Sequence, residues 1–573
     1  MKRVLIVGGA GEFGFRLAEG LCETTDLSVI IAGRDLTRAQ RAVETLRTRY
    51  PGQAIEAVRL DAAVITGADI RATGAWLVVD AAGPFQGAAP RVAQAAIAAG
   101  RHYVDLADAR DFVAGFHRLD EAARAADVLA VTGASSTPAL TQAVLDQMVA
   151  GWRRIDRVSV AILPDNRQPR GASVVKAILA YAGKPVRVWR NGQWTMEQGW
   201  GATARERVPG LGLRWLSLVE TPDLDLVPAR FPTGEATFRA GVELSVLHLG
   251  LAALSKLVSW RLIRSLVPFA SPLHWMAERM RAFGTDRGGM TVIAEGVDAD
   301  GRAVIATWCL IAVDGHGPNV PTLPALAVIK ALADGTLRKT AATPCVGLLP
   351  LERIAREFAR FRIVTRSFVE PRPLFARALG PAYAAMPRVL REGHDIDGRL
   401  VLTGRASVAG AQSALGRIIA RCFGFPDQAD DVPVTVEMTA DGDGEVWRRT
   451  IGTHRFASRL SPCTAGRGRV LEHFGPFTFE LAVAADTEGL RLTIVAGRLG
   501  PVPLPRALLP RSPAREFVDA DGRFRFDVPI SLPVFGLIVH YRGWLVPSAA
   551  APALAPAVQA SIQGHQLSRL PPS

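Results

Sequence analysis

The residues that decide the fold lie near the amino terminus: Val4-Leu5-Ile6-Val7-Gly8-Gly9-Ala10-Gly11-Glu12-Phe13-Gly14. The apolar run from 4 to 7 predicts a parallel strand that is covered on both faces. The glycines at 9, 11 and 14 form a G-x-G-x-x-G turn between this strand and a helix. Gly9 would permit the tight turn, Gly11 would let a pyrophosphate approach the backbone, and Gly14 would let helix and strand pack closely. The pattern predicts a dinucleotide-binding βαβ unit.

The start of the following helix belongs to the same predicted site. Glu12 and Phe13 are candidate cofactor-binding residues, because a helix N-terminus offers unpaired N–H groups to an anion. The alternative is a tight turn in a domain that has lost its cofactor. The position of the motif directly after the first strand favours the cofactor site.

Strand-like and helix-like segments alternate up to about residue 135. The expected strands are 29–31, 55–60, 77–80, 103–106 and 128–131, and the expected helices are 15–21, 36–50, 92–99 and 112–126. Such alternation is typical of a doubly wound parallel sheet. We therefore expect an α/β protein whose residues 1–135 form a Rossmann NAD(P)-binding domain.

The end of the second strand bears on which nicotinamide cofactor is bound. A carboxylate there would bind the ribose 2′-OH of NAD, whereas an arginine would accommodate the 2′-phosphate of NADP. Arg34 follows Gly33, which favours NADP(H) with NAD as the alternative, and Asp35 follows as either a ribose ligand or a helix N-cap. Asp61, after the third strand, could reach the adenine or cap its own loop.

The rest of the chain divides into two further predicted domains and a tail. The chain has 573 residues, of which 49% are hydrophobic and 21% charged, so several folded domains are expected. Residues 136–368 predict an α+β domain for substrate binding or dimerisation. Beyond a Pro371-Arg372-Pro373 linker, period-2 alternation predicts a mainly antiparallel β domain over 374–547. Residues 548–573 are expected to be a flexible tail.

Charge and cysteine content limit the classes of function. The formal net charge is +13, but the arginines are dispersed, so nucleic-acid binding ranks last. The five cysteines are far apart, form no C-x-x-C pair, and suit a reducing compartment. The first apolar run is too short for a signal peptide. We therefore expect a cytoplasmic protein without a metal site.

One apolar stretch, Leu244 to Leu266, is long enough to cross a bilayer. Lys256, Arg261 and Arg264 interrupt it, which disfavours a transmembrane helix. An interfacial or partner-binding helix and a buried domain helix remain the other two interpretations. Peripheral contact with a membrane or lipid is therefore among the expected partnerships.

Two motifs are similar to those of a known family. Val78-Val79-Asp80-Ala81-Ala82-Gly83-Pro84-Phe85 and Gly100-Arg101-His102-Tyr103-Val104-Asp105-Leu106 resemble the saccharopine dehydrogenase-like family, as do Thr132-Gly133-Ala134-Ser135-Ser136-Thr137-Pro138 and, more loosely, Leu348-Leu349-Pro350-Leu351-Glu352. The resemblance covers about 1 to 355. It implies that Ala82, Gly83, Pro84 and Phe85 form a loop beside the cofactor and that the stretch from His102 to Asp105 lies near the nicotinamide.

Candidate catalytic residues come from the second of these motifs. His102, Tyr103 and Asp105 are titratable groups that we expect at the carboxyl end of a strand, where one of them could transfer the proton that accompanies hydride transfer. The alternative is that Tyr103 packs and Asp105 caps a turn. In the middle domain, Asn166, Arg167, Arg170 and Lys176 could hold a substrate carboxylate or simply be solvated.

The third domain resembles an uncharacterised family, a domain of unknown function (DUF4166), that follows saccharopine dehydrogenase-like modules. Its His394, His454, His473 and His540 show no metal-ligand spacing. A strongly bent sheet with an apolar concave face could hold a lipid or another hydrophobic ligand.

Taken together, the residues and the resemblance predict an NADP(H)-dependent oxidoreductase. It would transfer a hydride to or from a carbonyl or imine carbon of a small molecule whose identity the sequence does not specify. The alternative is a protein that holds NADPH without catalysis, as a sensor or as a lipid- or membrane-associated binding protein. A homodimer is the expected assembly.

Overall fold

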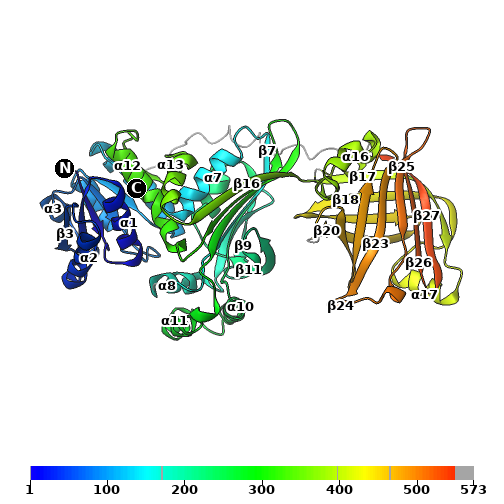
Figure 1. Ribbon diagram of the computed structural model, residues 1–573, viewed down its shortest axis with the longest axis horizontal. Helices are drawn as coiled ribbons and strands as arrows, with labels where there is room; N and C mark the ends of the chain where they lie inside the picture. Colours follow the sequence, from blue (N-terminus) through cyan, green and yellow to red (C-terminus); the bar gives the residue numbers. More distant parts are fainter. Residues whose placement is uncertain (1, 169–171, 397, 464–465, 534, 549–573) are drawn as a thin grey trace, which may run out of the picture. The chain divides into compact units, whose positions relative to one another are not determined.

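The computed structural model describes residues 2–168, 172–396, 398–463, 466–533 and 535–548 (Figure 1). Most of the expected tail, residues 549–573, and Arg170 lie outside the described residues. The chain forms two compact units, residues 1–369 and 370–573.

The first unit begins with a parallel sheet of seven strands in the order β15-β6-β5-β4-β1-β2-β3. The strands are β1 (Arg3–Val7), β2 (Ser28–Gly33), β3 (Ile55–Arg59), β4 (Leu77–Asp80), β5 (His102–Asp105), β6 (Leu129–Thr132) and β15 (Ala341–Pro344). This order is that of a dinucleotide-binding sheet, and the strand order reverses between β1 and β4. The expected Rossmann sheet is confirmed.

Helices cover both faces of this sheet. They are α1 (Glu12–Thr24), α2 (Leu36–Arg49), α3 (Gly67–Ala72), α4 (Arg91–Ala98), α5 (Arg110–Gly115), α6 (Asp120–Ala125) and α12 (Leu323–Ala333). The next α-helix after β6, α7 (Thr141–Met148), packs into the core of the middle domain instead. Val4 and Ile6 pack into one core cluster with α1, α2 and α12, whereas Leu5 and Val7 pack into a second cluster with α4 and α5. Burial on both faces explains why β1 is a continuous apolar run.

The Rossmann sheet is not built from one continuous segment. β15 pairs with the edge strand β6, and α12 packs on the sheet, although both follow the middle domain in the chain. The middle domain is therefore an insertion, and a linear division at residue 135 does not describe this arrangement.

The middle domain has a mixed sheet of nine strands, in which β7 pairs parallel with β12 and antiparallel with β13. The strands are β7 (Arg154–Leu163), β8 (Pro185–Arg190), β9 (Gln193–Gln198), β10 (Ala204–Val208), β11 (Gly212–Leu218), β12 (Thr233–Ala240), β13 (Gly288–Val297), β14 (Ala303–Ala312) and β16 (Ile363–Pro371). The helices are α8 (Ala172–Tyr181), α9 (Asp223–Arg230), α10 (Ser245–Ser259), α11 (Ala270–Arg279) and α13 (Leu351–Ala355). The expected α+β class is confirmed.

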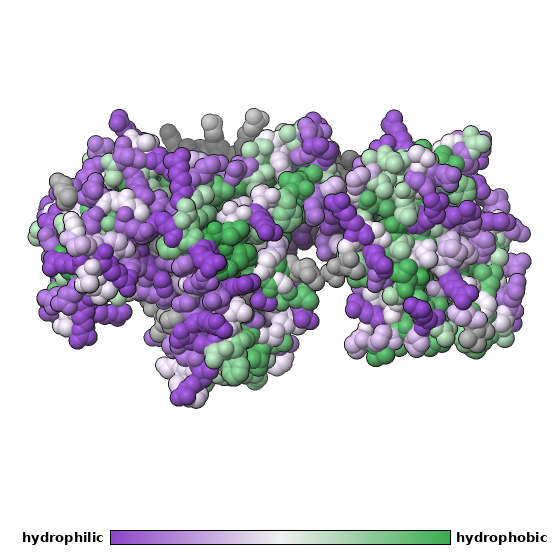
Figure 2. Space-filling model, viewed as in Figure 1, coloured by the Kyte–Doolittle hydropathy of each residue, from purple (hydrophilic) through white to green (hydrophobic). Residues whose placement is uncertain are grey.

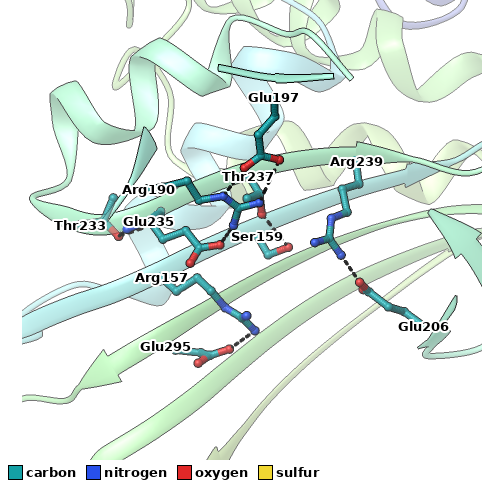
Figure 3. A network of polar contacts seen from close by, with 10 residues as sticks. All are labelled: Arg157, Ser159, Arg190, Glu197, Glu206, Thr233, Glu235, Thr237, Arg239 and Glu295. Atoms are coloured by element: carbon teal, nitrogen blue, oxygen red, sulfur yellow. Dashed lines mark hydrogen bonds and ion pairs between the residues drawn. The ribbon is translucent and has the colours of Figure 1, made fainter. Parts of the chain in front are cut away.

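The two faces of this sheet differ in polarity. Val158, Val160 and Phe238 point into a large apolar core. Alternating positions on the same strands carry a polar network, in which Arg157 pairs with Glu295 and Thr237 bonds to Ser159 (Figure 3). Period-2 alternation thus separates an apolar face from a charged one.

The apolar stretch around Leu244 to Leu266 forms α10 and a turn, not one long helix. Within the described residues, no helix is long and apolar enough to cross a membrane. The interpretation of this stretch as a transmembrane helix is therefore not supported.

The second unit is a closed antiparallel barrel. Its sheet runs β22-β21-β20-β19-β18-β17-β27-β26-β25-β23-β24, and an additional pairing of β22 with β23 closes it. The strands are β17 (Arg399–Gly410), β18 (Ala429–Asp441), β19 (Gly444–Ile451), β20 (His454–Pro462), β21 (Arg469–Phe474), β22 (Phe477–Ala485), β23 (Gly489–Leu499), β24 (Val502–Pro503), β25 (Pro513–Val518), β26 (Phe524–Leu532) and β27 (Gly536–Pro547). The expected antiparallel β domain is confirmed, and its bent sheet closes on itself through the pairing of β22 with β23.

Short helices accompany the barrel. They are α14 (Leu374–Leu379), α15 (Pro381–Ala385), α16 (Arg388–His394) and α17 (Ala414–Cys422). The first three precede β17, and α17 lies between β17 and β18, so the chain places helices at both ends of β17 (Figure 1).

Candidate functional site

The glycine-rich turn has the close contacts that its spacing predicts. A Cβ on Gly14 would lie 2.4 Å from the carbonyl oxygen of Gly8, and a Cβ on Gly9 would lie 2.9 Å from that of Ile6. A Cβ on Gly11 would meet only the Gly8 oxygen, at 3.0 Å. Gly9 and Gly14 therefore permit backbone packing, whereas Gly11 leaves open space on the outside of the turn, where a pyrophosphate would approach.

The helix that follows this turn starts without a side-chain cap. Gly11 is the N-cap of α1, and no side chain accepts a hydrogen bond from its first turn. Glu12 is the first helical residue, 3.9 Å from Arg16, and Phe13 packs partly against the core. An uncapped N-terminus suits a phosphate, because its N–H groups and the helix dipole both favour an anion. These residues fit a dinucleotide.

At the end of β2, two neighbouring side chains have different environments. Asp35 is the N-cap of α2, and its carboxylate accepts a hydrogen bond from the Arg38 N–H at 3.1 Å. Arg34 is exposed. The capping interpretation of Asp35 is therefore confirmed. Asp61 likewise accepts from the Ala63 N–H at 3.0 Å, as a loop cap would.

The loop after β4 lies against the glycine-rich turn. A Cβ on Gly8 would lie 2.8 Å from the carbonyl carbon of Ala81, so the two loops meet where the strand order reverses. Ala82 is held by its N–H bond to Asp80, at 2.9 Å. Gly83 and Pro84 follow, and Phe85 is buried against Phe112 at 5.2 Å between ring centroids. This loop therefore borders the candidate cofactor site.

Two of the candidate catalytic residues are buried inside this edge of the sheet. Tyr103 and Asp105 are both fully buried, and the Tyr103 hydroxyl donates to Asp105 at 3.0 Å. Asp105 also accepts from the N–H groups of Gly133 and Ala107 and from the Thr132 hydroxyl. This carboxyl group therefore joins the loops after β5 and β6.

Burial changes the titration of these carboxyl groups. It raises the pKa of Asp105 to about 7, against the opposing hydrogen bonds, and the pKa of Asp80 to about 6. The two carboxyls are register partners at the ends of neighbouring strands. Both carboxyls therefore keep a proton to a higher pH than exposed aspartates do.

The expectation that His102 lies at the carboxyl end of its strand is wrong. His102 is the first residue of β5 and pairs in register with Leu77, the first residue of β4. Its ring packs on Trp76 at 5.5 Å and accepts from the Leu129 N–H at 3.1 Å. The glycine-rich turn lies at the carboxyl edge of the sheet, where β5 ends with Asp105. His102 lies at the other edge, so the whole length of β5 separates it from Asp105.

Other polar residues at the carboxyl edge were not found from the sequence. Asp108 follows β5 and accepts from the Gln86 amide at 3.2 Å. Tyr181 ends α8 in the middle domain, and burial together with the charges of Asp108 and Glu220 raises its pKa. Glu220 in turn lies 3.7 Å from Arg110. No local pattern marks these residues, because only the fold brings α8 against the loops of the Rossmann sheet.

The motif from Thr132 to Pro138 connects the Rossmann sheet to α9. Asp223 accepts from Thr137 at 2.7 Å, from Thr141 at 2.6 Å and from Gln142 at 2.7 Å. Burial raises the pKa of Asp223 to about 6. The motif thus holds the two domains in one arrangement.

Three of the four middle-domain residues proposed for a substrate carboxylate lie within the described residues, and their environments differ. Asn166 is buried and donates to the carbonyl of Met280, and Arg167 donates to the carbonyl of Gly284. Lys176 is exposed. The first two hold a loop of the middle domain.

Comparison with known families agrees with these two units. The family model described as saccharopine dehydrogenase NADP binding domain matches residues 4–147. The model described as domain of unknown function (DUF4166) matches residues 386–545. Among curated proteins, no sequence matches the chain.

Three solved structures are among those found to be similar to parts of this chain. The apo saccharopine dehydrogenase (L-Glu forming) of Saccharomyces cerevisiae is 14% identical and matches 64% of this chain and 100% of its own, with a TM-score of 0.47. GenD2 from gentamicin A biosynthesis, in complex with NAD, is 17% identical and matches 64% of this chain and 96% of its own, with a TM-score of 0.31. A short-chain type dehydrogenase/reductase from Mycobacterium ulcerans, 19% identical, matches 23% of this chain and 66% of its own, with a TM-score of 0.19.

The family assignment rests on the two sequence models, whose boundaries fall inside the two compact units. The first model covers the strands β1 to β6, the glycine-rich turn and the loops that follow β4, β5 and β6. The chain therefore joins a domain that matches the saccharopine dehydrogenase NADP binding domain family to one that matches a domain of unknown function (DUF4166).

Proposed function

We propose that this protein is an NADP(H)-dependent oxidoreductase that transfers a hydride to or from a carbonyl or imine carbon of a small molecule. The observation that carries the proposal is the glycine-rich turn, which stands at the reversal of strand order with open space at Gly11 and an uncapped α1. Ligands of open α/β sheets bind at this place. The match to an NADP binding domain model supports the same reading.

NADP(H) is favoured over NAD(H) by the side chains at the end of β2. Asp35 is engaged as the N-cap of α2, which leaves the exposed Arg34 as the group available to a 2′-phosphate. Arg–phosphate pairs are strong because the guanidinium donates two parallel N–H bonds. The ribose 2′-OH of NAD(H) carries no negative charge with which the Arg34 guanidinium could pair.

When bound, the nicotinamide supplies or accepts the hydride, and the chain has to supply the proton. Asp108 and Glu220 are carboxylates near the Tyr181 hydroxyl, and Asp108 follows the carboxyl end of β5. The Tyr181 hydroxyl can hydrogen-bond to a developing alkoxide or amine, and the pKa values of Asp108 and Glu220 are raised by burial, which favours these carboxyls as the source of the proton. The full burial of Tyr103 and Asp105 favours a positioning role for those two residues.

The first experiment is equilibrium binding of NADPH and NADH to the full chain. It is followed by loss of the reduced-nicotinamide absorbance with pooled keto acids, imines and apolar carbonyl compounds. Tighter binding of NADPH with substrate-dependent oxidation is the expected result. Tight binding without turnover would favour a non-catalytic NADPH sensor, and no binding would contradict both functions.

The proton-transfer group is tested by Asp108→Asn and Tyr181→Phe. General acid–base catalysis contributes about 10²–10⁴-fold, so the turnover number should fall by a factor in this range while NADPH affinity is kept. Asp111→Asn, at an exposed position nearby, is the control. Unchanged turnover in both variants would remove these residues from the mechanism.

A second candidate function, contact with a membrane surface, is favoured by a patch on the middle domain. We define the apolar patch as the exposed side chains on and around α10 and α11. These are Val246, Leu249, Trp260, Leu262, Val267, Phe269, Trp275, Met276 and Phe283. In Figure 2, apolar side chains gather over the end of the first unit where α10 and α11 lie. Exposed patches of this kind are unusual in proteins without a partner surface.

The charges around the apolar patch indicate an anionic bilayer as its partner. Lys256, Arg261, Arg264 and Arg279 are exposed beside the apolar side chains. Each cation near an anionic surface contributes about 1 kcal/mol, and tryptophan prefers the interface. The patch therefore has the composition of a surface-binding amphipathic element.

Vesicle flotation tests this second function. The full chain should float with vesicles that contain phosphatidylserine and less with pure phosphatidylcholine. The double variant Trp260→Ser/Trp275→Ser should lose flotation, while Val64→Ser, an equally exposed apolar residue of the Rossmann domain, should not. Equal flotation of both variants would contradict the assignment.

A further inference from the structure

The barrel of the second unit encloses a cavity with mostly apolar walls. The cavity has a volume of about 190 Å³. The wall includes Val436, Phe456, Phe479, Ile494 and Phe526, whose side chains alternate with outward-facing residues of the same strands. An apolar cavity of about 150 Å³ can hold benzene, so this interior has room for an organic ligand.

Aromatic side chains span the interior. The rings of Phe456 on β20 and Tyr541 on β27 are 6.1 Å apart between centroids, although these strands are not neighbours in the sheet. Phe526 lies 6.2 Å from Tyr541 on the other side. The contacts show that the cavity is bounded by side chains from opposite walls.

The first polar group in this wall is a loosely paired arginine. Arg449 donates to the Ser458 hydroxyl at 2.9 Å, and its closest approach to Glu472 is 3.8 Å, beyond hydrogen-bond length. Its guanidinium also lies over the rings of Trp447 and Phe456. Since Arg carries five N–H donors, it keeps hydrogen-bonding capacity toward the cavity.

The second polar group is a buried histidine and carboxylate pair. His394 Nε2 lies 2.5 Å from Glu516, and both side chains line the cavity. Burial opposes the charged imidazole, but the charge and hydrogen bond of Glu516 outweigh it and raise the pKa of His394. The Nδ1 atom of this nearly inaccessible ring has no hydrogen-bond partner among the described residues.

The charges in this interior balance. Arg449 and protonated His394 contribute two positive charges, and Glu472 and Glu516 contribute two negative ones. Glu445 lies behind the wall, where it accepts from the Leu374 N–H and the Trp447 ring N–H, and burial raises its pKa, which favours its neutral form. A ligand with an ionic head would leave an unpaired charge in a medium of low dielectric constant, which is costly.

We propose that the barrel is a binding site for a neutral, largely apolar molecule with a single hydrogen-bonding head such as a hydroxyl or carbonyl group. The apolar wall takes the body of the ligand. The donors of Arg449 and the unpartnered Nδ1 of His394 take the head. The site lies in the second unit and does not depend on the oxidoreductase activity proposed for the first.

Three probes of equal chain length test the head-group preference. Octanol, octanoate and octylamine are titrated into the full chain by calorimetry at neutral pH. Octanol should bind, and the two charged probes should bind about tenfold more weakly or not at all. Equal affinity for octanoate and octanol, or no binding of octanol, would overturn the proposal.

Substitutions at two neighbouring residues of β23 test whether the ligand binds inside the barrel. Ile494 lines the cavity, whereas the next residue, Val495, is 41% exposed on the outer face. Ile494→Trp should abolish octanol binding by filling the cavity, and Val495→Trp should leave it unchanged. Equal binding by the two variants would place the ligand elsewhere and contradict the proposal.

A charge variant tests the same site by a gain of binding. Glu472→Gln keeps the size of the side chain but leaves the interior with net positive charge. Octanoate should then bind about tenfold more tightly than to the unmodified chain, with octanol little changed. The control is Glu480→Gln, whose side chain pairs with Arg469 on the outer face of the neighbouring strand. No gain for octanoate in the first variant, or the same gain in both, would refute the charge argument.

Discussion

At the scale of single residues, the division of roles between Arg34 and Asp35 determines the expected cofactor preference. Asp35 caps α2, so Arg34 is the side chain available at the end of β2. Arg34→Ala should weaken NADPH binding by about 1.5–3 kcal/mol, the value of a charge-assisted hydrogen bond, and leave NADH binding unchanged. Fluorescence titration with both cofactors measures the difference.

The matched control for this substitution is Arg41→Ala, an exposed arginine farther along α2. It changes the net charge equally but should not alter the ratio of the two affinities. An identical loss of NADPH affinity in both variants would point to general electrostatics and not to a 2′-phosphate contact.

The buried carboxyl of Asp105 should make the stability of the first unit depend on pH. Its pKa is raised to about 7 by burial, so the folded state keeps a proton that the unfolded state has lost. The resulting stabilisation is present at acidic pH and is lost as the pH rises through about 7. From about pH 5 to about pH 8 the free energy of unfolding should fall by about 2–3 kcal/mol through this group.

Asp105→Asn isolates this contribution, because the amide does not titrate. Its oxygen can still accept from Gly133, Ala107 and Thr132, so the variant should fold with a flatter pH dependence in urea denaturation. Asp111→Asn should keep the slope of the parent chain. A parent slope of zero would show that Asp105 is ionised when folded.

At the scale of elements, different glycines of the turn between β1 and α1 serve backbone packing and ligand binding. A Cβ on Gly14 would lie 2.4 Å from backbone, whereas a Cβ on Gly11 faces open space apart from the Gly8 oxygen. Gly14→Ala should therefore destabilise the first unit by about 1–3 kcal/mol, the usual cost of overpacking, and also abolish dinucleotide binding.

Gly11→Ala should separate the two effects. The variant should keep the thermal stability of the parent in the absence of ligand but lose NADPH affinity, because the new methyl group occupies the path of the pyrophosphate. Gly115→Ala, which has free space for its Cβ, is the control for the loss of a glycine. Unchanged NADPH affinity in Gly11→Ala would contradict the assigned site.

The strands also show which parts of the fold can be predicted from local sequence patterns. The apolar run of β1, the β-branched run of β2 and the alternation of β18, β19 and β26 are local signals, and all these strands form as expected. The alternation is weaker in β21 and β25. Their interior residues include Glu472 and Glu516, which break the apolar alternation because they face a polar part of the cavity.

At the scale of the molecule, the two compact units should respond to different ligands. Each has its own hydrophobic core, and the described chain divides between them at Val369 and Glu370. In differential scanning calorimetry, NADPH should raise only the transition of the first unit. At a hundred times its dissociation constant the expected stabilisation is about 2.7 kcal/mol.

Octanol should raise only the transition of the second unit in the same experiment. A single transition that shifts with either ligand would show that the units unfold together. Two transitions that both shift with NADPH would instead indicate that the barrel takes part in cofactor binding.

Local sequence determined the Rossmann sheet, its glycine-rich turn and the antiparallel character of the second unit. These features follow from side-chain periodicity and from the special backbone demands of glycine, which act over a few residues.

The tertiary structure decided the features that depend on pairing distant segments. These are the return of α12 and β15 to the first sheet, the placing of His102 at the far edge, the meeting of Asp108 with Tyr181, and the closure of the barrel around balanced charges. Such contacts join residues that are tens to hundreds of positions apart. Because they depend on how the intervening chain closes on itself, they produce no periodic pattern in the sequence from which they could be predicted.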